Sequence, residues 1–238
     1  MNTPLTPRTP LRVAVTGGTS GLGLALVEAF AARGDAVAFV ARHDDAVAKV
    51  ARRIAGSHGI VGDVARKDDA HAIALQDGAA LGSLDVLVNN ASSLGPVPLA
   101  LLADTECEDF EAALATNLFG PFRLTKAVLG ALAASAREGR PAIVVNIGSD
   151  AGVSAYANWG AYGASKAAVM HMSRTWDEEL REHGVRVIAH DPGDMDTPMH
   201  AQALPEADPA TLKRPEQAAR ELLERIAQLI LRPEQVAA

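Results

Sequence analysis

The sequence has 238 residues, of which 48% are hydrophobic and 21% charged, so it is long enough for a full hydrophobic core and too apolar for a disordered chain. Its 22 basic and 29 acidic residues give a net charge of −7 at pH 7, the opposite of the basic balance typical of nucleic-acid-binding domains. The single cysteine, Cys107, excludes an internal disulfide and a cysteine-based zinc site, and no apolar run reaches the roughly 18 residues of a membrane-spanning helix. We therefore expect a cytoplasmic enzyme or binding domain with no metal site.

Residues 1–10 include three prolines and lack the charged and apolar regions of a signal peptide, so we expect a disordered arm there. Residues 11–238 are expected to form one domain, because no proline-rich or charged linker interrupts them and no internal repeat is present.

Six short apolar runs predict strands at residues 12–16, 36–40, 59–62, 85–89, 142–147 and 185–190. The runs are nearly continuous instead of alternating, which indicates parallel strands covered by helices on both faces. Segments with apolar residues three and four apart predict helices at residues 22–33, 44–55, 68–81, 105–137, 161–183 and 215–231. This alternation predicts a doubly wound α/β domain of the Rossmann type, whose ligands bind beyond the carboxyl ends of the strands.

The first strand is followed by a glycine-rich turn, residues 16–23, which reads Thr16-Gly17-Gly18-Thr19-Ser20-Gly21-Leu22-Gly23. Glycines allow a tight turn and close approach to a phosphate, and the helix that follows offers free N–H groups and a partial positive charge. The strand–turn–helix context predicts a dinucleotide site. A P-loop is disfavoured because no Gly-Lys-Ser/Thr sequence ends the turn.

The end of the second predicted strand decides between the two nicotinamide dinucleotides. Many domains that bind NAD place an acidic residue there for the ribose 2′-hydroxyl. This chain has Arg42, whose guanidinium suits the 2′-phosphate of NADP. We therefore expect NADP(H) to be preferred over NAD(H), the alternative being a solvated arginine paired with Asp44 or Asp45.

Tyr162 and Lys166 are four residues apart in a predicted helix, so their side chains share one helix face. A nearby positive charge favours phenolate and would lower the tyrosine pKa, which suits proton exchange with an alcohol or alkoxide. Ser149 ends the fifth predicted strand, where its hydroxyl could hold the oxygen of a substrate.

These residues belong to a longer ordered pattern, which spans about residues 11–200: Thr16-Gly17…Gly21-Leu22-Gly23, Asp63-Val64, Asn89-Asn90-Ala91, Asn117, Ser149, Tyr162-x-x-x-Lys166 and Pro192-Gly193. In this pattern the chain resembles the short-chain dehydrogenase/reductase family. The resemblance implies an oxidoreductase that transfers a hydride between NADP(H) and a carbonyl or secondary alcohol, and a homo-oligomer, either dimer or tetramer.

The resemblance also implies roles for single residues. Tyr162 would be the general acid and base, Ser149 would orient the substrate carbonyl, and Lys166 would bind the nicotinamide ribose and lower the tyrosine pKa. Asn117 would hold a water of a proton relay, although an asparagine within a helix is more often a local bend. The residues implied in cofactor binding are Gly17, Thr19, Ser20, Gly21, Leu22, Gly23, Arg42, Asp63, Val64, Asn90, Ala91, Tyr162, Lys166, Pro192, Gly193 and Thr197.

Some of these implied contacts have simpler alternatives. Asp63 would bond the adenine amino group, with Val64 against the ring, and Asn90 and Ala91 would line the adenosine ribose. Thr197 would contact the nicotinamide carboxamide or a phosphate. Asp63 and Thr197 are also residue types that commonly cap helices.

The chain departs from the family pattern at two places. Ser92 follows Asn89-Asn90-Ala91 where the family has glycine, and residues 232–238 do not resemble the usual seventh strand, which puts the usual tetramer in doubt. Between the sixth strand and the last helix, residues 192–215 are polar and rich in proline, and we expect them to form a substrate lid.

Two other functions remain as alternatives. One is a cofactor-binding regulatory or scaffold protein without turnover, against which the intact Tyr–Lys pair argues. The other is a sugar-nucleotide epimerase or dehydratase, for which the chain leaves little length for a second subdomain.

Overall fold

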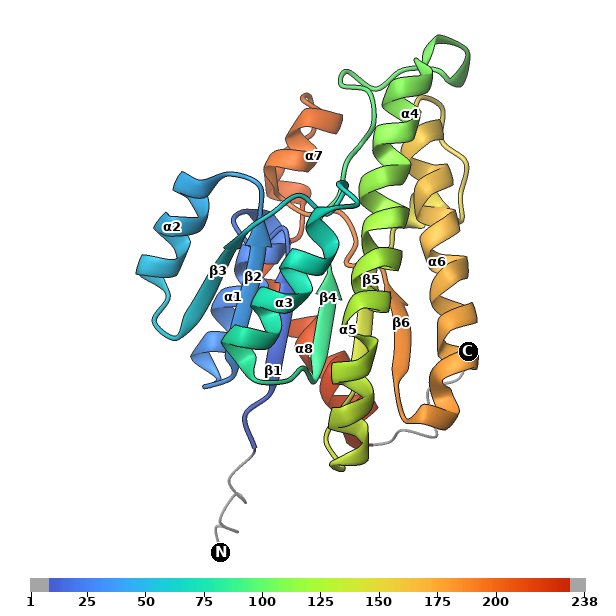
Figure 1. The fold of residues 1–238 in the computed structure, drawn as a ribbon. Helices are drawn as coiled ribbons and strands as arrows, with labels where there is room; N and C mark the ends of the chain where they lie inside the picture. Colours follow the sequence, from blue (N-terminus) through green and yellow to red (C-terminus); the bar gives the residue numbers. More distant parts are fainter. Residues whose placement is uncertain (1–8, 232–238) are drawn as a thin grey trace, which may run out of the picture.

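Six parallel strands form one twisted sheet in the computed structural model, which describes residues 9–231 (Figure 1). The strands are β1 (Arg12–Thr16), β2 (Ala36–Ala41), β3 (Ser57–Val61), β4 (Val86–Asn89), β5 (Ile143–Ile147) and β6 (Arg186–His190). They lie in the order β3-β2-β1-β4-β5-β6, which confirms the predicted doubly wound Rossmann-like fold. The strand order reverses between β1 and β4, so a ligand crevice is expected above these two strands.

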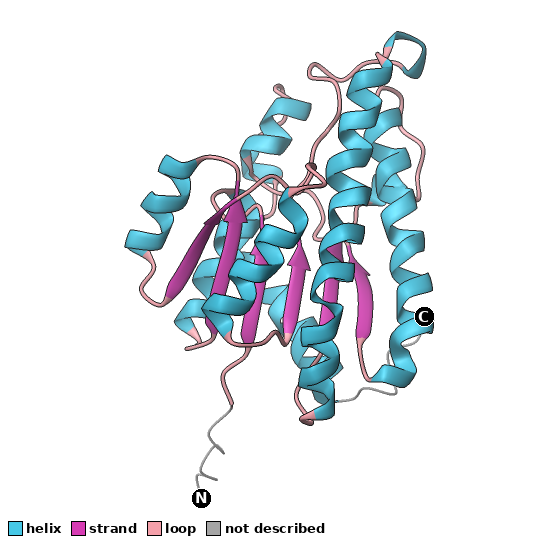
Figure 2. Cartoon of the chain, in the orientation of Figure 1, coloured by secondary structure: helices cyan, strands magenta, loops and turns pink. Residues whose placement is uncertain are grey.

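The sheet is buried on both faces because alternate residues of each strand point to opposite sides. Val13 and Val15 join one hydrophobic cluster while Ala14, between them, joins the other. The first cluster is covered by α1 (Gly21–Ala32), α2 (Asp44–Arg53) and α8 (Pro215–Leu231), and the second by α3 (Asp69–Leu81), α5 (Gly120–Arg137) and α6 (Gly160–Leu180). Figure 2 shows this arrangement of helices around the sheet.

The predicted helix at residues 105–137 is not one regular helix. It consists of α4 (Cys107–Leu114), a π-helical turn (Ala115–Phe119) and α5. Pro121 explains the break, because proline has no N–H to donate to the carbonyl of Asn117 four residues earlier and its ring would crowd that carbonyl. The chain adopts a wider turn instead, in which the Gly120 N–H bonds to the Ala115 carbonyl, five residues earlier.

The segment predicted as a lid contains more structure than expected. It holds α7 (Pro198–Ala203) and a short 3-10 turn (Pro209–Thr211). Main-chain hydrogen bonds at 3.0 Å join Lys213 to Asp194 and Asp196, and Met195 pairs with Lys213 as an isolated β-bridge. The two ends of the segment are therefore hydrogen-bonded to each other, and we call this paired part, residues 192–197 and 213, the base of the lid.

Other element boundaries differ from the prediction by only a few residues. The largest difference among the strands is at β3, which begins at Ser57 instead of residue 59. Most of the predicted N-terminal arm and the stretch 232–238, where no seventh strand was expected, lie outside the described residues. Within residues 9–231, no helix combines the length and apolar character needed to cross a membrane.

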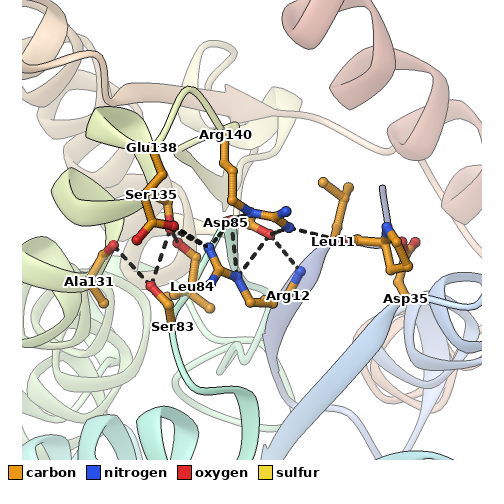
Figure 3. A network of polar contacts seen from close by, with 11 residues as sticks. Leu11, Arg12, Asp35, Ser83, Leu84, Asp85, Ala131, Ser135, Glu138 and Arg140 are labelled. Atoms are coloured by element: carbon orange, nitrogen blue, oxygen red, sulfur yellow. Dashed lines mark hydrogen bonds and ion pairs between the residues drawn. The ribbon is translucent and has the colours of Figure 1, made fainter. Parts of the chain in front are cut away.

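The amino end of the sheet, opposite the expected crevice, holds a cluster of buried charge (Figure 3). The Asp85 carboxylate accepts hydrogen bonds from Arg12 Nη2 at 2.8 Å and from Arg140 Nη2 at 2.6 Å. Arg12 Nη2 also donates to Ser135 Oγ near the end of α5, at 2.9 Å. The cluster thus ties β1, the start of β4 and the end of α5 together.

Candidate active site

The glycine-rich turn lies at the carboxyl end of β1, against the end of β2. The Gly17 and Gly18 N–H groups both donate to the Val40 carbonyl, at 2.8 and 3.2 Å. Gly17 has φ +70°, and a Cβ there would come within 2.9 Å of the Asn90 side chain. A Cβ on Gly23 would collide with the Gly17 carbonyl oxygen. The close packing therefore requires glycine at both positions. The turn leads directly into α1, whose N-terminus is the kind of place where an anion binds.

Asn90 supports the glycine-rich turn from β4. Its Nδ2 donates to the Thr16 carbonyl at 2.9 Å, and the N–H groups of Asn90 and Ala91 both donate to Thr16 Oγ1 at 3.0 Å. The side chain of Asn90 thus stabilises the turn. The sequence implied only a place beside the adenosine ribose for this residue. This contact joins β1 and β4 at the point where the strand order reverses.

Arg42 lies just beyond the end of β2, beside the glycine-rich turn, and its side chain is exposed. Among residues 9–231 no hydrogen bond or ion pair engages Arg42, so the alternative pairing with Asp44 or Asp45 is not formed. Its guanidinium is available for an external anion.

Asp63 follows β3, and its Oδ1 accepts the Ala65 N–H at 3.0 Å. The Asp63 N–H in turn donates to Asp69 Oδ2, at 2.9 Å. Val64 is buried against Gly120, where a Cβ would come within 3.1 Å of the Val64 carbonyl oxygen. The structure thus gives Asp63 a local turn-closing role, while the helix-capping alternative fails because Asp68 precedes α3.

Tyr162 and Lys166 lie in the first turns of α6, and Ser149 follows β5. Lys166 is 3% exposed, and its Nζ donates to the Ile147 carbonyl at 2.7 Å and lies 5.4 Å from the centre of the Tyr162 ring. Ser149 donates to Asp150 Oδ1 at 3.1 Å and accepts the Ala151 N–H at 3.2 Å. The structure therefore brings the phenol, the ammonium and the hydroxyl into one site, as the sequence predicts.

The electrostatics of this site differ from the expectation. Burial raises the pKa of Tyr162 to about 12; a hydrogen bond with Ser149 lowers it, and the nearby carboxylates of Asp191, Asp150 and Asp194 raise it. Burial also lowers the pKa of Lys166 to about 8, against an opposing effect of Asp191. Contrary to the predicted direction, the pKa of the phenol is raised and not lowered in the chain alone. Tyr162 is therefore protonated at neutral pH and ready to donate a proton.

Asn117 lies in the π-helical turn and is 2% exposed. Its Oδ1 accepts the Ser93 N–H at 2.8 Å and the Ser92 hydroxyl at 3.1 Å. Its Nδ2 donates to the Ser93 carbonyl at 2.7 Å and to Ser165 Oγ at 2.8 Å. The side-chain amide is fully used, so a bond from Asn117 to a relay water would have to come from its main-chain carbonyl.

The base of the predicted lid lies next to the glycine-rich turn. A Cβ on Gly21 would come within 3.1 Å of Thr197 Cγ2, and Gly193 has φ +74°. Thr197 accepts the His200 N–H at 3.2 Å, so its hydroxyl caps α7, in agreement with the simpler alternative.

Two neighbours of the site, Asp150 and Ser165, were not among the residues that the sequence predicts for it. Asp150 directly follows Ser149 and also accepts a hydrogen bond from the Tyr156 hydroxyl at 2.8 Å. Ser165 is fully buried and donates to the Tyr162 carbonyl at 2.6 Å. Both stand beside recognised motif residues in the sequence, so adjacency alone could have drawn attention to them. Within residues 9–231 no group of three or more His, Cys, Asp and Glu side chains is arranged to hold a metal ion.

Comparisons with known proteins agree on one family. The sequence model described as short chain dehydrogenase matches residues 12–208. The chain is 36% identical over 192 residues to an uncharacterized short-chain type dehydrogenase/reductase of Sinorhizobium fredii, covering 80% of this chain and 33% of that protein, so the chain spans about a third of that relative. It is 33% identical over 190 residues to 2-(R)-hydroxypropyl-CoM dehydrogenase of Xanthobacter autotrophicus, covering 78% of this chain and 74% of that protein.

Solved structures give the same result at the level of the fold. A short chain dehydrogenase from Shigella flexneri complexed with NADP superimposes with a TM-score of 0.81 at 26% identity, covering 92% of this chain and 90% of the other. A 3-ketoacyl-(acyl-carrier-protein) reductase from Brucella melitensis complexed with NADH has a TM-score of 0.81 at 24% identity, covering 92% and 89%. The similar structures thus contain both kinds of nicotinamide cofactor.

Proposed function

The chain belongs to the short-chain dehydrogenase family, and from this premise we propose that it is an NADP-dependent oxidoreductase acting on a carbonyl or secondary alcohol, with Tyr162 as the proton donor and acceptor. The observation that carries the proposal is the convergence of Tyr162, Ser149 and Lys166 in one site, at the same end of the sheet as the glycine-rich turn. NADP(H) would supply and accept the hydride.

The residues present fit a dinucleotide. Gly17, Gly21 and Gly23 let the turn pack closely against its neighbours, and the N-terminus of α1, where an anion would bind, follows directly. Thr19, Ser20 and Leu22 complete this turn, while Asp63, Val64 and Ala91 would bound the adenosine end. Pro192, Gly193 and Thr197, at the base of the lid, would bound the nicotinamide end.

The preference for NADP rests on Arg42. Its exposed guanidinium has no partner among the described residues and lies where a 2′-phosphate would be read. We expect Arg42→Ala to weaken NADPH binding about tenfold or more and to leave NADH binding nearly unchanged, because a charge-assisted bond contributes about 1.5 to 3 kcal/mol.

Fluorescence titration of both cofactors measures this effect, with Arg52→Ala, an exposed arginine of α2, as the matched control. If the ratio of the two affinities were the same in Arg42→Ala and in the parent, the 2′-phosphate role would be wrong.

In the proposed reaction the chain moves protons and orients the substrate. Ser149 would donate to the substrate oxygen after its hydroxyl turns away from Asp150. Tyr162, whose pKa burial raises to about 12 so that the phenol is protonated at neutral pH, would give its proton to the alkoxide that forms on this oxygen. Lys166, held on the Ile147 carbonyl beneath the ring, would bind the ribose and help to return a proton to the phenol.

Turnover of the Tyr162→Phe variant tests the proton transfer. With a panel of ketones, quinones and pteridines, and NADPH consumption as the readout, we expect kcat to fall about 100- to 10,000-fold because the general acid is lost. The affinity for NADPH, measured by titration, should stay within about threefold of the parent and serves as the internal control. Ordinary turnover by Tyr162→Phe would show that another group supplies the proton.

The alternative of a binding protein without turnover predicts the opposite outcome of the same panel. Such a protein would bind NADPH and consume none with any carbonyl. We propose turnover because a protein that only binds a dinucleotide has no need of the Tyr162 phenol paired with the buried Lys166 ammonium. We also propose that residues 192–215 act as the substrate lid and that the protein acts in the cytoplasm. We propose further that it forms a homodimer or tetramer, and light scattering would measure the mass of this assembly.

A further inference from the structure

Ser92 occupies the position at which the chain departs from the family pattern. Its hydroxyl donates to Asn117 Oδ1 at 3.1 Å, and the same oxygen accepts the Ser93 N–H at 2.8 Å. A glycine at this position would leave the oxygen with the Ser93 N–H as its one donor among the bonds described. The departure from the pattern therefore adds a second tether to Asn117.

The opposite side of the same amide is also held. Asn117 Nδ2 donates to the Ser93 carbonyl at 2.7 Å and to Ser165 Oγ at 2.8 Å. Ser165 then donates to the Tyr162 carbonyl at 2.6 Å. A continuous chain of hydrogen bonds thus runs from the loop after β4, through the π-helical turn, to the main chain of Tyr162.

The main chain at Asn117 depends on these side-chain bonds more than an ordinary helical residue does. Its carbonyl has no N–H donor four residues later, because residue 121 is proline. The helical ladder is therefore interrupted at Asn117, where the side-chain bonds to Ser92, Ser93 and Ser165 hold the residue instead.

We propose that Ser92 is a positioning residue, which fixes the side chain of Asn117 and thereby, through Ser165, the main chain of Tyr162. The proposal rests on the proposed function. Ser92 acts through Asn117 and is assigned no contact with substrate or cofactor. Loss of its hydroxyl would loosen the first link of this chain of hydrogen bonds, so proton transfer by Tyr162 would slow while the affinity for the cofactor would stay the same.

The test compares Ser92→Ala with the parent in steady-state turnover. We expect kcat to fall about three- to tenfold, the size of effect that one hydrogen bond produces, while the KM for NADPH changes less than twofold. We also expect the solvent deuterium isotope effect on kcat to increase, because a merely structural role would leave it unchanged. Ser92→Thr, which keeps a hydroxyl, should restore most of the loss in kcat.

Ser57→Ala is the matched control. The Ser57 hydroxyl also makes one hydrogen bond, to the Ile54 carbonyl at 2.8 Å, but Ser57 begins β3, at the end of the sheet away from the site. We expect its kcat and isotope effect to equal those of the parent. If Ser92→Ala matched the parent as Ser57→Ala should, the positioning role would be overturned.

A second measurement separates this proposal from the proposed function. Urea unfolding of Ser92→Ala, Asn117→Ala and the double variant gives the coupling between the two side chains without any turnover. We expect a nonadditive effect, and strict additivity would overturn the tether even in an active enzyme. If the parent reduced no carbonyl of the panel, the proposed function itself would fail, whatever the unfolding cycle showed.

Discussion

Replacing Asp85 with asparagine removes the carboxylate that Arg12 and Arg140 share at the amino end of the sheet (Figure 3). The side chain of Asp85 has no exposed surface, and both arginines are about one fifth exposed. Burial alone would raise the pKa of Asp85, but hydrogen bonds from Arg140 and Arg12 outweigh it and lower the pKa from 3.8 to about 2. The ionised carboxylate is therefore more stable in the folded chain than in the unfolded one.

The size of the effect follows from this pKa. A lowering from 3.8 to about 2 corresponds to about 2 kcal/mol of folding free energy at pH 7, at about 1.4 kcal/mol per pKa unit. Removing one partner of a buried pair typically costs about 3 to 5 kcal/mol, and here the partly exposed arginines can still reach water. We expect Asp85→Asn to lower the free energy of unfolding by about 2 to 4 kcal/mol at pH 7.

Urea unfolding between pH 7 and pH 2.5 measures this difference. Because the folded pKa is lowered, the stabilisation is fully present above the unfolded value of 3.8 and is lost as pH falls toward about 2. The gap between parent and variant should therefore shrink below about pH 4. Asp104→Asn, an exposed carboxylate with no ion pair among the described residues, is the control and should change stability by less than about 0.5 kcal/mol. A gap of that small size for Asp85→Asn at pH 7, or one that does not change with pH, would refute the reasoning.

Asp77 and Lys166 are buried groups whose charged forms cost stability, and each gives a prediction. Burial raises the pKa of Asp77 from 3.8 to about 7, so the free energy of unfolding should fall as pH rises from about 4 to 7, by at most about 4 kcal/mol. In urea unfolding, Asp77→Asn should abolish this decrease in the free energy of unfolding. If the variant showed the same pH dependence as the parent, the role of Asp77 would be contradicted. Burial lowers the pKa of Lys166 from 10.5 to about 8, so the charged side chain costs stability at neutral pH. Lys166→Met should therefore raise the unfolding midpoint while kcat falls at least about 100-fold, and a lower midpoint would contradict the burial argument.

The sheet could be predicted from the sequence because its determinants are local. Runs such as Ala36–Ala41 are apolar at every position, and that pattern requires helices on both faces of parallel strands. The Tyr162 and Lys166 pair could also be predicted, since a separation of four residues in a helix fixes a shared face. The glycine-rich turn could be predicted for the same reason, because its glycines lie directly between a predicted strand and a predicted helix.

The roles of the side chains around the site depended on contacts between distant segments. Asn90 bonds to Thr16 across 74 residues of sequence, and Asn117 bonds to Ser165 across 48. Spacing within one element carries no information about such pairs.

The electrostatic state of Tyr162 was likewise decided by the tertiary structure. The sequence indicated that Lys166 would lower the pKa of the phenol, but burial and the carboxylates that follow β5 and β6 raise it to about 12. The sequence by itself determined which chemical groups are present and which element carries each of them, because periodicity and turn residues act over a few positions. Desolvation and long-range hydrogen bonds exist only after the segments meet, so the tertiary structure alone decided the direction in which the pKa of Tyr162 shifts and the hydrogen bonds that hold Asn117.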